Sequence, residues 1–427
     1  MFEMKLHEFI ARRVILLIPV MIGVSILTYS LLSLVPGDAA ASACGDKCGV
    51  VVDTALEWNT TSEQWEEVSI SAYESNVMRM GLDENLLEGY MVYVGIDGPY
   101  VGAEPLRLNS SGYLVPKTSL GEHTERNGLI DGYWGDSSLY HRPVAEVVKD
   151  FAPVTLEMSL LALLIAYPLG IFLGILSAVW QDQIFDQLSR LMAIAFVSLP
   201  IFWLAILFQK LFATKIGICD DLFGTSGGCF PIFGRHDPSV AFPTGDDQYV
   251  SWYPAGGTGF HLIDSWFVND ETLSLMGSDF DTRWELFKDT LLHLMLPCMT
   301  LGIASAGGLL RYMRASLLEV LREDYVRTAR AKGLSGYRVI VVHACRNALV
   351  PIVTLLGFSI GGAIGGAVLT ESIFAFTGMG RIAVEAIQYD DQVVVMGVTL
   401  ITSVIFLMSN LIVDISYAIV DPRVRLE

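Results

Sequence analysis

The chain has 427 residues, of which 52% are hydrophobic and 17% charged, and its formal net charge is −19. A mean hydropathy of +0.50 is too apolar for an ordinary soluble domain and indicates a membrane protein. The negative charge excludes binding to nucleic acid, which requires a basic surface.

Six stretches are long and apolar enough to cross a bilayer, which takes about 20 residues. In chain order they are Val14–Val35, Met158–Gln181, Leu191–Gln209, Thr290–Leu310, Ala348–Thr370 and Val393–Val413. The sequence therefore predicts an all-α polytopic membrane protein with six transmembrane helices. Ala39–Ala43 resembles a signal-peptidase site, but the first run has 22 uncharged residues. Since a signal peptide has an apolar region of about 7–15 residues, we expect this run to remain as a helix.

The charges between the spans predict the orientation of the chain. Residues 36–152 carry 19 acidic and 7 basic side chains, and residues 212–289 carry 12 and 4, whereas residues 311–346 carry 3 acidic and 8 basic ones. Further bases flank the first and last spans: Lys5, Arg12, Arg13, Arg423 and Arg425. Since positive flanks stay in the cytoplasm, we expect both termini and 311–346 inside and the two acidic segments outside.

This orientation defines the expected regions of the chain. They are an N-terminal tail with the first helix (1–35), an extracellular region (36–152), helices two and three (153–211), an extracellular insertion (212–289), and helices four to six (290–427) with a cytoplasmic loop at 313–347. The acidic outer segments would attract cationic substrates or belong to a salt-adapted protein. The second interpretation fits better, because only 8 of the 27 basic residues are lysine.

Four of the six cysteines fall in the predicted outer segments, where disulfides persist. Cys219 and Cys229 bracket a glycine-rich loop, and we expect them to be bridged. Cys44 and Cys48 either form a second bridge or hold a metal ion. No histidine or further cysteine lies nearby in the sequence, so we expect no metal site. Cys298 and Cys345, in and just below the membrane, are expected to stay free.

The sequence lacks the motifs of an enzyme or of a pump with its own energy source. It contains no Gly-Lys dipeptide, and hence no phosphate-binding P-loop. Ionisable residues inside membrane spans are functional candidates by default, but only Glu157, His293 and Asp414 come close to the six runs, and we expect structural roles for all three. An energy source for uphill transport would have to lie on another chain.

Between the fourth and fifth runs lies a basic, amphipathic segment. Its apolar residues recur every three or four positions from Ala315, which predicts a helix. Gly333 is placed to end that helix in a left-handed conformation, and Ser335 to cap a second one. The small residues before Gly333 would let another surface approach the backbone. The chemistry alone leaves two alternatives: a helix lying on anionic lipid, or a helix held in the groove of a partner protein.

This segment resembles the coupling loop of ATP-binding-cassette (ABC) importer permeases. More narrowly, the chain is similar to the first permease subunit of dipeptide, oligopeptide and nickel importers. The resemblance covers FIARRVILLIPVMIGVSILTYSLLSLVPGD (9–38), RPVAEVVKDFAPVTLEMSLLALLIAYPLGIFLGIL (142–176), SLPIFWLAILF (198–208), and an almost unbroken stretch from HLMLPCMTLGIASAGGLLRYMRASLLEVLREDYVRTARAKGL at 293 to VDPRVR at 420–425. The wider family has Glu-Ala-Ala where this chain has Arg327-Thr328-Ala329, and its proline is displaced to Pro351. Residues 36–141 match only thinly, and 212–289 is longer than usual.

The resemblance implies a type I ABC importer permease fold in the cell membrane, forming half of a path for peptides or similar solutes. It implies that a separate ATPase binds the loop through Asp324, Tyr325, Thr328, Ala329, Arg330, Ala331, Lys332, Gly333 and Leu334. The implied partners are a second permease subunit, two ATPase subunits and an extracellular substrate-binding protein. This chain would bind no cofactor, while the ATPase would use ATP and magnesium. Relatives also carry oligosaccharides, nickel or glutathione.

Glycines recur along the fifth run, at Gly357, Gly361, Gly362, Gly365 and Gly366. Such a ridge lets helices pack closely in lipid, either within this chain or against a second permease subunit. The polar segment that follows, residues 370–392, is expected to fold at the outer mouth. Two other classes of protein stay open as alternatives: a secondary transporter or channel driven by its own gradient, and a membrane-anchored assembly protein.

Overall fold

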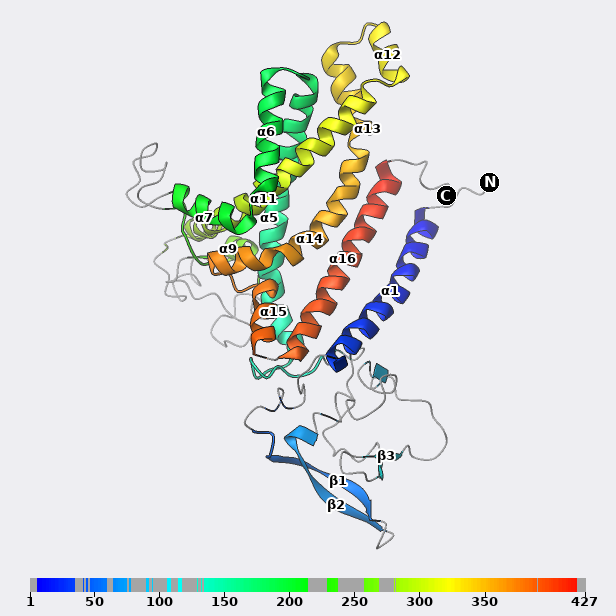
Figure 1. Cartoon of the computed structure of the whole chain (residues 1–427), viewed down its shortest axis with the longest axis vertical. Coiled ribbons are helices and arrows are strands. Elements are labelled where there is room, and N and C mark those ends of the chain that lie inside the picture. The colour runs from blue at the N-terminus through cyan, green and yellow to red at the C-terminus, as the bar shows by residue number, and fades with distance from the viewer. Residues whose placement is uncertain are drawn as a thin grey trace. The chain divides into compact units, whose positions relative to one another are not determined.

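The computed structural model is predominantly helical (Figure 1). It describes residues 6–34, 47–59, 64–74, 106–108, 114–116, 132, 134–213, 229–236, 257–268, 282–389 and 391–420, together with residues 41, 44, 77, 90, 91, 94, 129 and 280. The chain divides into two compact units. The first comprises Met1–Leu17, Asp150–Arg381 and Val404–Glu427, and the second comprises Ile18–Lys149 and Ile382–Ser403.

Helices account for all the predicted membrane runs. The helices are α1 (Leu6–Leu34), α5 (Val144–Val179), α6 (Ile184–Ser198), α7 (Ile201–Phe212), α9 (His261–Phe267), α11 (Arg283–Val320), α12 (Asp324–Ala331), a π-helix (Arg338–Ala344), α13 (Cys345–Ala348), α14 (Val350–Phe374), α15 (Met379–Gln388) and α16 (Gln392–Val420). In the described part of the chain, α1, α5, α11 and α16 are each long and apolar enough to cross a bilayer. Three bent pairs raise the number of candidate spans to as many as seven, so the chain is a multi-pass membrane protein and the count of six stays a prediction.

The third predicted span, Leu191–Gln209, is not a single straight helix. It is divided between α6 and α7, which meet at an angle of 110°. Proline lacks the backbone N–H that a helix interior needs and forces the preceding residue out of the helical region. Leu199 accordingly has extended backbone angles, and α7 restarts directly after Pro200. The expectation of one continuous helix here was wrong.

The prediction of an all-α chain is also wrong for the segment between α1 and α5. Strand β1 (Val51–Asn59) pairs with β2 (Gln64–Ser71) in antiparallel register, with Trp58 opposite Trp65. A second small antiparallel pair joins β3 (Leu106–Leu108) to β4 (Leu114–Pro116). β1 and β2 are rich in β-branched and aromatic residues, which favour strands over helices. This preference for strands could be read from the sequence, but the sequence analysis gave more weight to the long apolar runs elsewhere in the chain.

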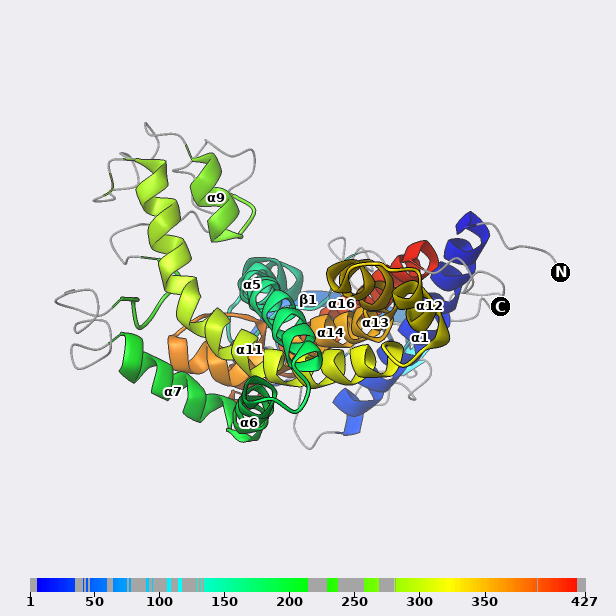
Figure 2. The ribbon, with the colours of Figure 1, turned by 90° about the horizontal axis from the view of Figure 1, so that it is seen from above.

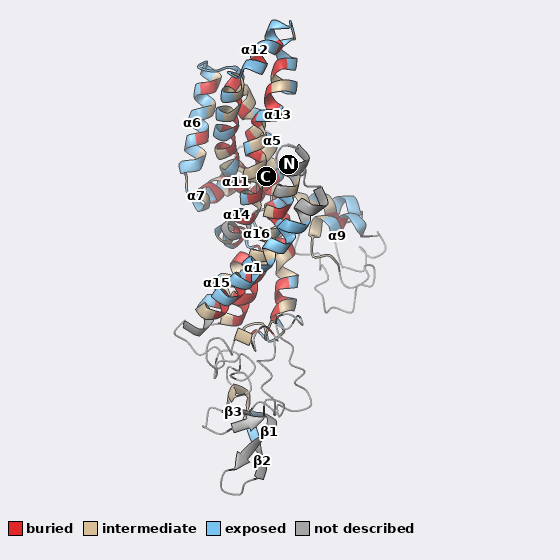
Figure 3. Cartoon of the chain, turned by 90° about the vertical axis from the view of Figure 1, so that its right-hand side faces the viewer, coloured by how far each residue is buried: buried red, intermediate tan, exposed pale blue. Residues whose placement is uncertain are grey.

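Large apolar side chains remain exposed along several helices. On α6, Ile184 is 77% exposed and Leu191 63% exposed, and α6 is largely exposed in Figure 3. On α1, Ile15 and Leu27 are 63% and 60% exposed. A soluble protein rarely leaves such continuous apolar surfaces in water. Helices of this kind fit a bilayer, where lipid chains cover the apolar side chains.

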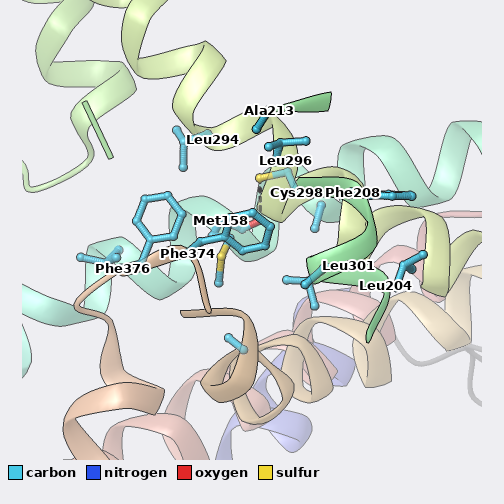
Figure 4. Close-up of a cluster of buried hydrophobic side chains, with 14 residues drawn as sticks. Met158, Leu204, Phe208, Ala213, Leu294, Leu296, Cys298, Leu301, Phe374 and Phe376 are labelled. Carbon is cyan, nitrogen blue, oxygen red and sulfur yellow. Dashed lines mark hydrogen bonds between the residues drawn. The ribbon is translucent and has the colours of Figure 1, made fainter. Parts of the chain in front are cut away.

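The main apolar core of the first unit lies where α5, α7, α11 and α14 meet. Figure 4 shows Met158 of α5 and Phe374 of α14 at its centre, both at most 1% exposed. Cys298 of α11 is also buried, and its thiol donates a hydrogen bond to the carbonyl of Met158 at 3.4 Å. The remaining members include Leu204, Phe208, Ala213, Leu294, Leu296, Leu301 and Phe376. The core therefore joins the bent α6–α7 pair to α11.

Glycines allow α5 and α11 to approach each other closely. A Cβ atom on Gly170 would lie 2.6 Å from Cβ of Leu309 and 3.0 Å from the carbonyl oxygen of Ala306. At Gly174 it would lie 2.7 Å from Cβ of Met313. Since real side chains do not approach so closely, only glycine fits at these positions. The sequence analysis singled out the glycines of the fifth run and missed this pair.

A buried acid anchors the loop before α5 within the second unit. Asp391 is 1% exposed and accepts hydrogen bonds from the hydroxyl of Ser137 at 2.6 Å and from the backbone N–H of Leu139 at 3.0 Å. Its other oxygen accepts from the backbone N–H of Val394 at 3.1 Å, in the first turn of α16. A carboxylate at that end of a helix satisfies free N–H groups and the helix dipole.

Glu157 ties the segment between α7 and α11 to α5. Its carboxylate accepts a hydrogen bond from the guanidinium of Arg235 at 2.5 Å and another from the backbone N–H of Leu262, in the first turn of α9, at 2.8 Å. Arg235 also donates to the carbonyl of Gly259 at 2.9 Å. These contacts confirm the structural role expected for Glu157. His293 lies on α11 with its ring nitrogen 2.9 Å from the carbonyl of Asp289.

Candidate functional site

The predicted coupling loop is built from two short helices joined at Gly333. The first, α12, is separate from α11, because the chain breaks at residues 321–323. The expectation of one helix running from Ala315 to Gly333 was therefore wrong. Two charged residues, Arg322 and Glu323, lie in the break, and a third, Asp324, begins α12. The second helical segment begins at residue 336, continues through the π-helix into α13, and leads into α14 with Pro351 in its first turn.

Gly333 closes α12 in the left-handed conformation that the sequence predicted, with φ of +76°. Its backbone N–H donates to the carbonyl of Arg330 at 3.0 Å, and the N–H of Leu334 donates to the carbonyl of Ala329 at 3.4 Å. These two bonds together form a Schellman motif, which satisfies the last carbonyl groups of a helix. A Cβ on Gly333 would have no atom within 4 Å. The position thus favours glycine through its backbone angle rather than through lack of space.

The loop has a small apolar core of its own. Val326 and Val339 are 0% and 1% exposed, and Ala329 between them is 7% exposed. Leu321 and Leu334 pack against this group. Ala329 therefore faces the interior of the loop, whereas the sequence analysis expected it to face a partner. The spacing of apolar residues in one helix shows which residues share a face. Which of those faces is buried depends on the second loop helix, and the spacing does not show that.

The opposite side of α12 is open. Thr328, Arg330, Ala331, Lys332 and Gly333 are exposed, and the helix is mainly exposed in Figure 3. Two apolar side chains of the second helical segment are exposed as well: Tyr337 is 73% exposed and Val342 56%. We refer to residues 328, 330–333, 337 and 342 as the loop face. It combines small residues, two cations and two apolar side chains, which suits a protein surface as a partner.

The base of the loop is fixed to the helices that lead into the membrane. Ser316 of α11 donates a hydrogen bond to the carbonyl of Ala348 in α13 at 2.9 Å. Leu317, also on α11, is fully buried against Ala344, Cys345 and Ala348. These contacts connect the loop to both α11 and α13.

A buried ion pair joins α11 to the first turn of α6. Arg314 donates to both carboxylate oxygens of Asp186, each at 2.7 Å, and Asp186 is 0% exposed. Asp186 also accepts from the hydroxyl of Ser177 at 2.6 Å and from the N–H of Asp182 at 3.0 Å. A two-pronged contact of this kind fixes orientation as well as distance. The pair is 128 residues apart in the sequence, and no local pattern could have revealed it.

Glu371 is another buried acid that the sequence analysis missed. It lies near the end of α14, is 0% exposed, and accepts a hydrogen bond from the hydroxyl of Thr155 on α5 at 2.6 Å. Its other oxygen accepts from the backbone N–H of Arg381 in α15 at 2.8 Å. The Thr155 hydroxyl accepts in turn from the N–H of Met379. These bonds fix the 89° bend between α14 and α15 to α5.

The glycines of the fifth run lie on α14 and meet α16. A Cβ on Gly357 would lie 2.8 Å from Val413, and one on Gly361 would overlap the ring of Phe406. At these two positions the ridge packs within the chain, whereas Gly362 has open space in front of it. The surroundings of Gly365, Gly366 and Asp414 lie outside the described residues.

The predicted outer cysteines are oxidised where the structure describes them. Cys44 and Cys48 form a disulfide, which decides between the bridge and the metal ligand. Cys229 is also in a disulfide. Its expected partner Cys219 lies outside the described residues, so that pairing stays a prediction. Cys298 and Cys345 are free and buried.

Comparison with known proteins identifies the class. Residues 170–426 match the family of binding-protein-dependent transport system inner membrane components. The dipeptide transport system permease protein DppB of Alkalihalophilus pseudofirmus is 32% identical over 97% of this chain and 98% of its own length. The di/tripeptide permease protein DppB of Pseudomonas aeruginosa is 33% identical over 98% of both chains, and the dipeptide permease protein DppB of Escherichia coli K12 is 31% identical over 98% of both.

The chain therefore belongs to the family of membrane permease components of binding-protein-dependent ABC importers. The family predicted from the sequence is confirmed, and the matched region includes the whole loop, the last third of α5 and all helices after it.

Proposed function

We propose that this chain forms half of the translocation path of an ATP-driven importer of peptides or similar small solutes. ATP hydrolysis takes place on a separate, magnesium-dependent ATPase subunit, and this chain binds no cofactor. A second permease subunit completes the path, and an extracellular binding protein delivers the solute. Peptides are the favoured substrate class because the relatives are named for transport of dipeptides and tripeptides.

The loop face carries the proposal. The Schellman turn at Gly333 and the apolar core around Val326 give α12 a fixed shape, while its other side stays open. The contacts at Ser316 and Leu317 connect that shape to α11 and α13. A partner that pushes on the loop face would thereby move helices in the membrane. We propose that this partner is the ATPase, and that the loop and both termini are cytoplasmic.

The test changes the charge of the loop face at two exposed positions and leaves the left-handed turn at Gly333 intact. Ala331→Glu and Lys332→Glu each place an acid at an exposed position of the loop. In vesicles reconstituted with the ATPase subunits, a second permease subunit and the binding protein, both variants should insert normally yet lose substrate-stimulated ATP hydrolysis and uptake. Gln181→Glu, in the exposed turn between α5 and α6, is the matched control and should behave as wild type. Normal coupled uptake in both loop variants would contradict the proposal and favour a secondary transporter.

The orientation is tested separately by labelling intact cells. Single cysteines at Gly333 and at Gly228, which lies outside the described residues, should differ in reactivity towards a reagent that does not cross membranes. The first should react only after permeabilisation and the second without it. The reverse pattern would place the loop outside and remove the ATPase from the mechanism.

A further inference from the structure

The short helix α9 has the reverse of the usual arrangement of polar and apolar residues. Asp264 and Ser265 are 3% and 0% exposed, whereas Ile263, Trp266 and Phe267 are 43%, 49% and 62% exposed. The three apolar residues are spaced at i, i+3 and i+4, so they share one face of the helix. On a soluble protein that face would be the buried one.

The preceding turn locks α9 in this orientation. Asp264 accepts hydrogen bonds from the N–H and hydroxyl of Thr258 at 3.0 and 2.7 Å, and from the N–H of Gly259 at 3.0 Å. Gly259 has φ of +78°, and a Cβ there would lie 2.8 Å from a ring carbon of Pro153 on α5. With Asp264 held in this way and Glu157 bonded to the first turn, α9 cannot rotate to bury its apolar face.

The exposed face continues onto the beginning of α11. The ring of Trp266 lies 6.2 Å from that of Trp284 and 5.3 Å from that of Phe287, measured between ring centroids. Trp284 is itself 59% exposed. Figure 2 shows α9 beside the first turns of α11. We call Ile263, Trp266, Phe267, Trp284 and Phe287 the aromatic patch.

The position of the aromatic patch along α11 shows at which level of the bilayer the patch lies. The uncharged run of α11 begins at Thr290, directly after Asp289. With a helical rise of about 1.5 Å per residue, Trp284 lies about 9 Å before that point along the axis. The headgroup region on each side of the hydrocarbon core is about 5–8 Å deep. Phe287, about 4.5 Å before Thr290, therefore lies within the headgroup region, and Trp284 lies at its outer edge. Aromatic side chains, tryptophan above all, concentrate at this level of membrane proteins.

We propose that the aromatic patch inserts into the interfacial region of a phospholipid bilayer and anchors the insertion between α7 and α11 to the membrane surface. The charged residues on the adjacent turns of α11, Arg283, Glu285, Lys288 and Asp289, balance one another. The contact therefore depends on the apolar and indole side chains and is insensitive to headgroup charge. It does not depend on coupling to an ATPase.

The test places an environment-sensitive fluorophore on the patch. Phe267→Cys is labelled with an NBD maleimide and reconstituted in nanodiscs of phosphatidylcholine, with and without phosphatidylglycerol. The expected result is a blue-shifted emission that is quenched by lipids with a spin label near the glycerol backbone, weakly quenched by lipids labelled near the chain end, and protected from iodide. Both lipid compositions should give the same result. Background labelling of the buried Cys298 and Cys345 is measured on the wild-type chain.

The matched control is Glu285→Cys, one residue beyond Trp284 and exposed, which should respond more to iodide and less to lipid. Equal iodide quenching at both positions, with no effect of spin-labelled lipid, would overturn the proposal. It would also fall if the label became protected only when the binding protein was added, since the patch would then be a protein-docking surface.

Discussion

Ala329 and Ala331 lie two residues apart on α12 and face in different directions. Ala329 is 7% exposed and packs with Val326 and Val339, whereas Ala331 is exposed on the loop face. The same change at the two positions therefore tests two different properties.

Ala329→Glu should destabilise the loop, because it forces a long charged side chain into a filled apolar core. Overpacking costs about 1–3 kcal/mol, and burial of the charge adds to this cost. Ala331→Glu should leave stability unchanged while removing coupling. Thermal unfolding and protease sensitivity of the loop, measured in detergent for both variants, check this difference. Equal stability of the two would show that Ala329 is not packed.

Arg314→Lys should weaken the contact between α11 and the first turn of α6. Lysine supplies a point charge but cannot reproduce two hydrogen bonds to one carboxylate.

Asp186→Asn should destabilise the protein more, because it leaves Arg314 without its counter-charge. Removing one member of a buried pair lowers the free energy of unfolding by about 3–5 kcal/mol. Since the Arg314 side chain is 16% exposed, we expect a loss at or below the low end of that range. Unfolding temperatures measure these effects. Arg190, 49% exposed, lies 4.0 Å from the same carboxylate, so Arg190→Lys should lower the unfolding temperature less than Arg314→Lys.

Thr155→Val should loosen the α14–α15 bend. Valine has the same shape but neither donates to Glu371 nor accepts from the N–H of Met379. Leaving buried polar groups unsatisfied costs about 1–3 kcal/mol. Ser159→Ala, one turn further along α5, is the control, since the buried Ser159 hydroxyl has no hydrogen-bond partner among the residues that the structure describes. A stability loss in Ser159→Ala equal to that in Thr155→Val would contradict this explanation.

Acidification should destabilise the segment around α9. Burial, together with the charges of Arg235 and His236, holds the pKa of His261 well below its ordinary value. The folded state thus keeps His261 neutral, while the unfolded chain takes up a proton below a pH of about 6.5. Stability is therefore full above that pH and falls as the pH drops below it. Hydrogen exchange of the α9 amides between neutral and mildly acidic pH should show this loss in wild type and less of it in His261→Leu.

The cysteines should separate into two chemical groups. Without reductant, Cys44, Cys48 and Cys229 should resist alkylation in unfolded protein, and Cys298 and Cys345 should react. Mass mapping of the peptides also tests the predicted link between Cys219 and Cys229. Free alkylation of either of those two cysteines in non-reduced protein would exclude it.

Hydropathy located the membrane helices well because burial in lipid is a property of consecutive residues. The run Val393–Val413 lies inside α16, and Thr290–Leu310 lies inside α11. Gly333 was predictable for a similar reason, since a left-handed helix end is a local feature with a strong residue preference.

The polar contacts were not predictable, because they join residues far apart in the chain. Neither Asp186 with Arg314 nor Thr155 with Glu371 has a local signature, and Glu371 fell in a segment that the sequence assigned to the outer mouth. The orientation of Ala329 depends on Val339, which arrives only after the chain has reversed at Gly333. The bend at Pro200 did have a local signal, but the apolar residues on both sides of it suggested a continuous span.

The interlocking of α5 with α11 limits how this chain can change shape. At Gly170 and Gly174 the neighbouring helix occupies the space that a side chain would take, so sliding by even one residue would bring bulkier residues into the same gap. We expect the two helices to tilt together as one rigid body during transport. The changes in helix angle during transport, which open one side of the path and close the other, would then be concentrated at two bends. One is Leu199–Pro200, between α6 and α7, and the other is Leu349, between α13 and α14.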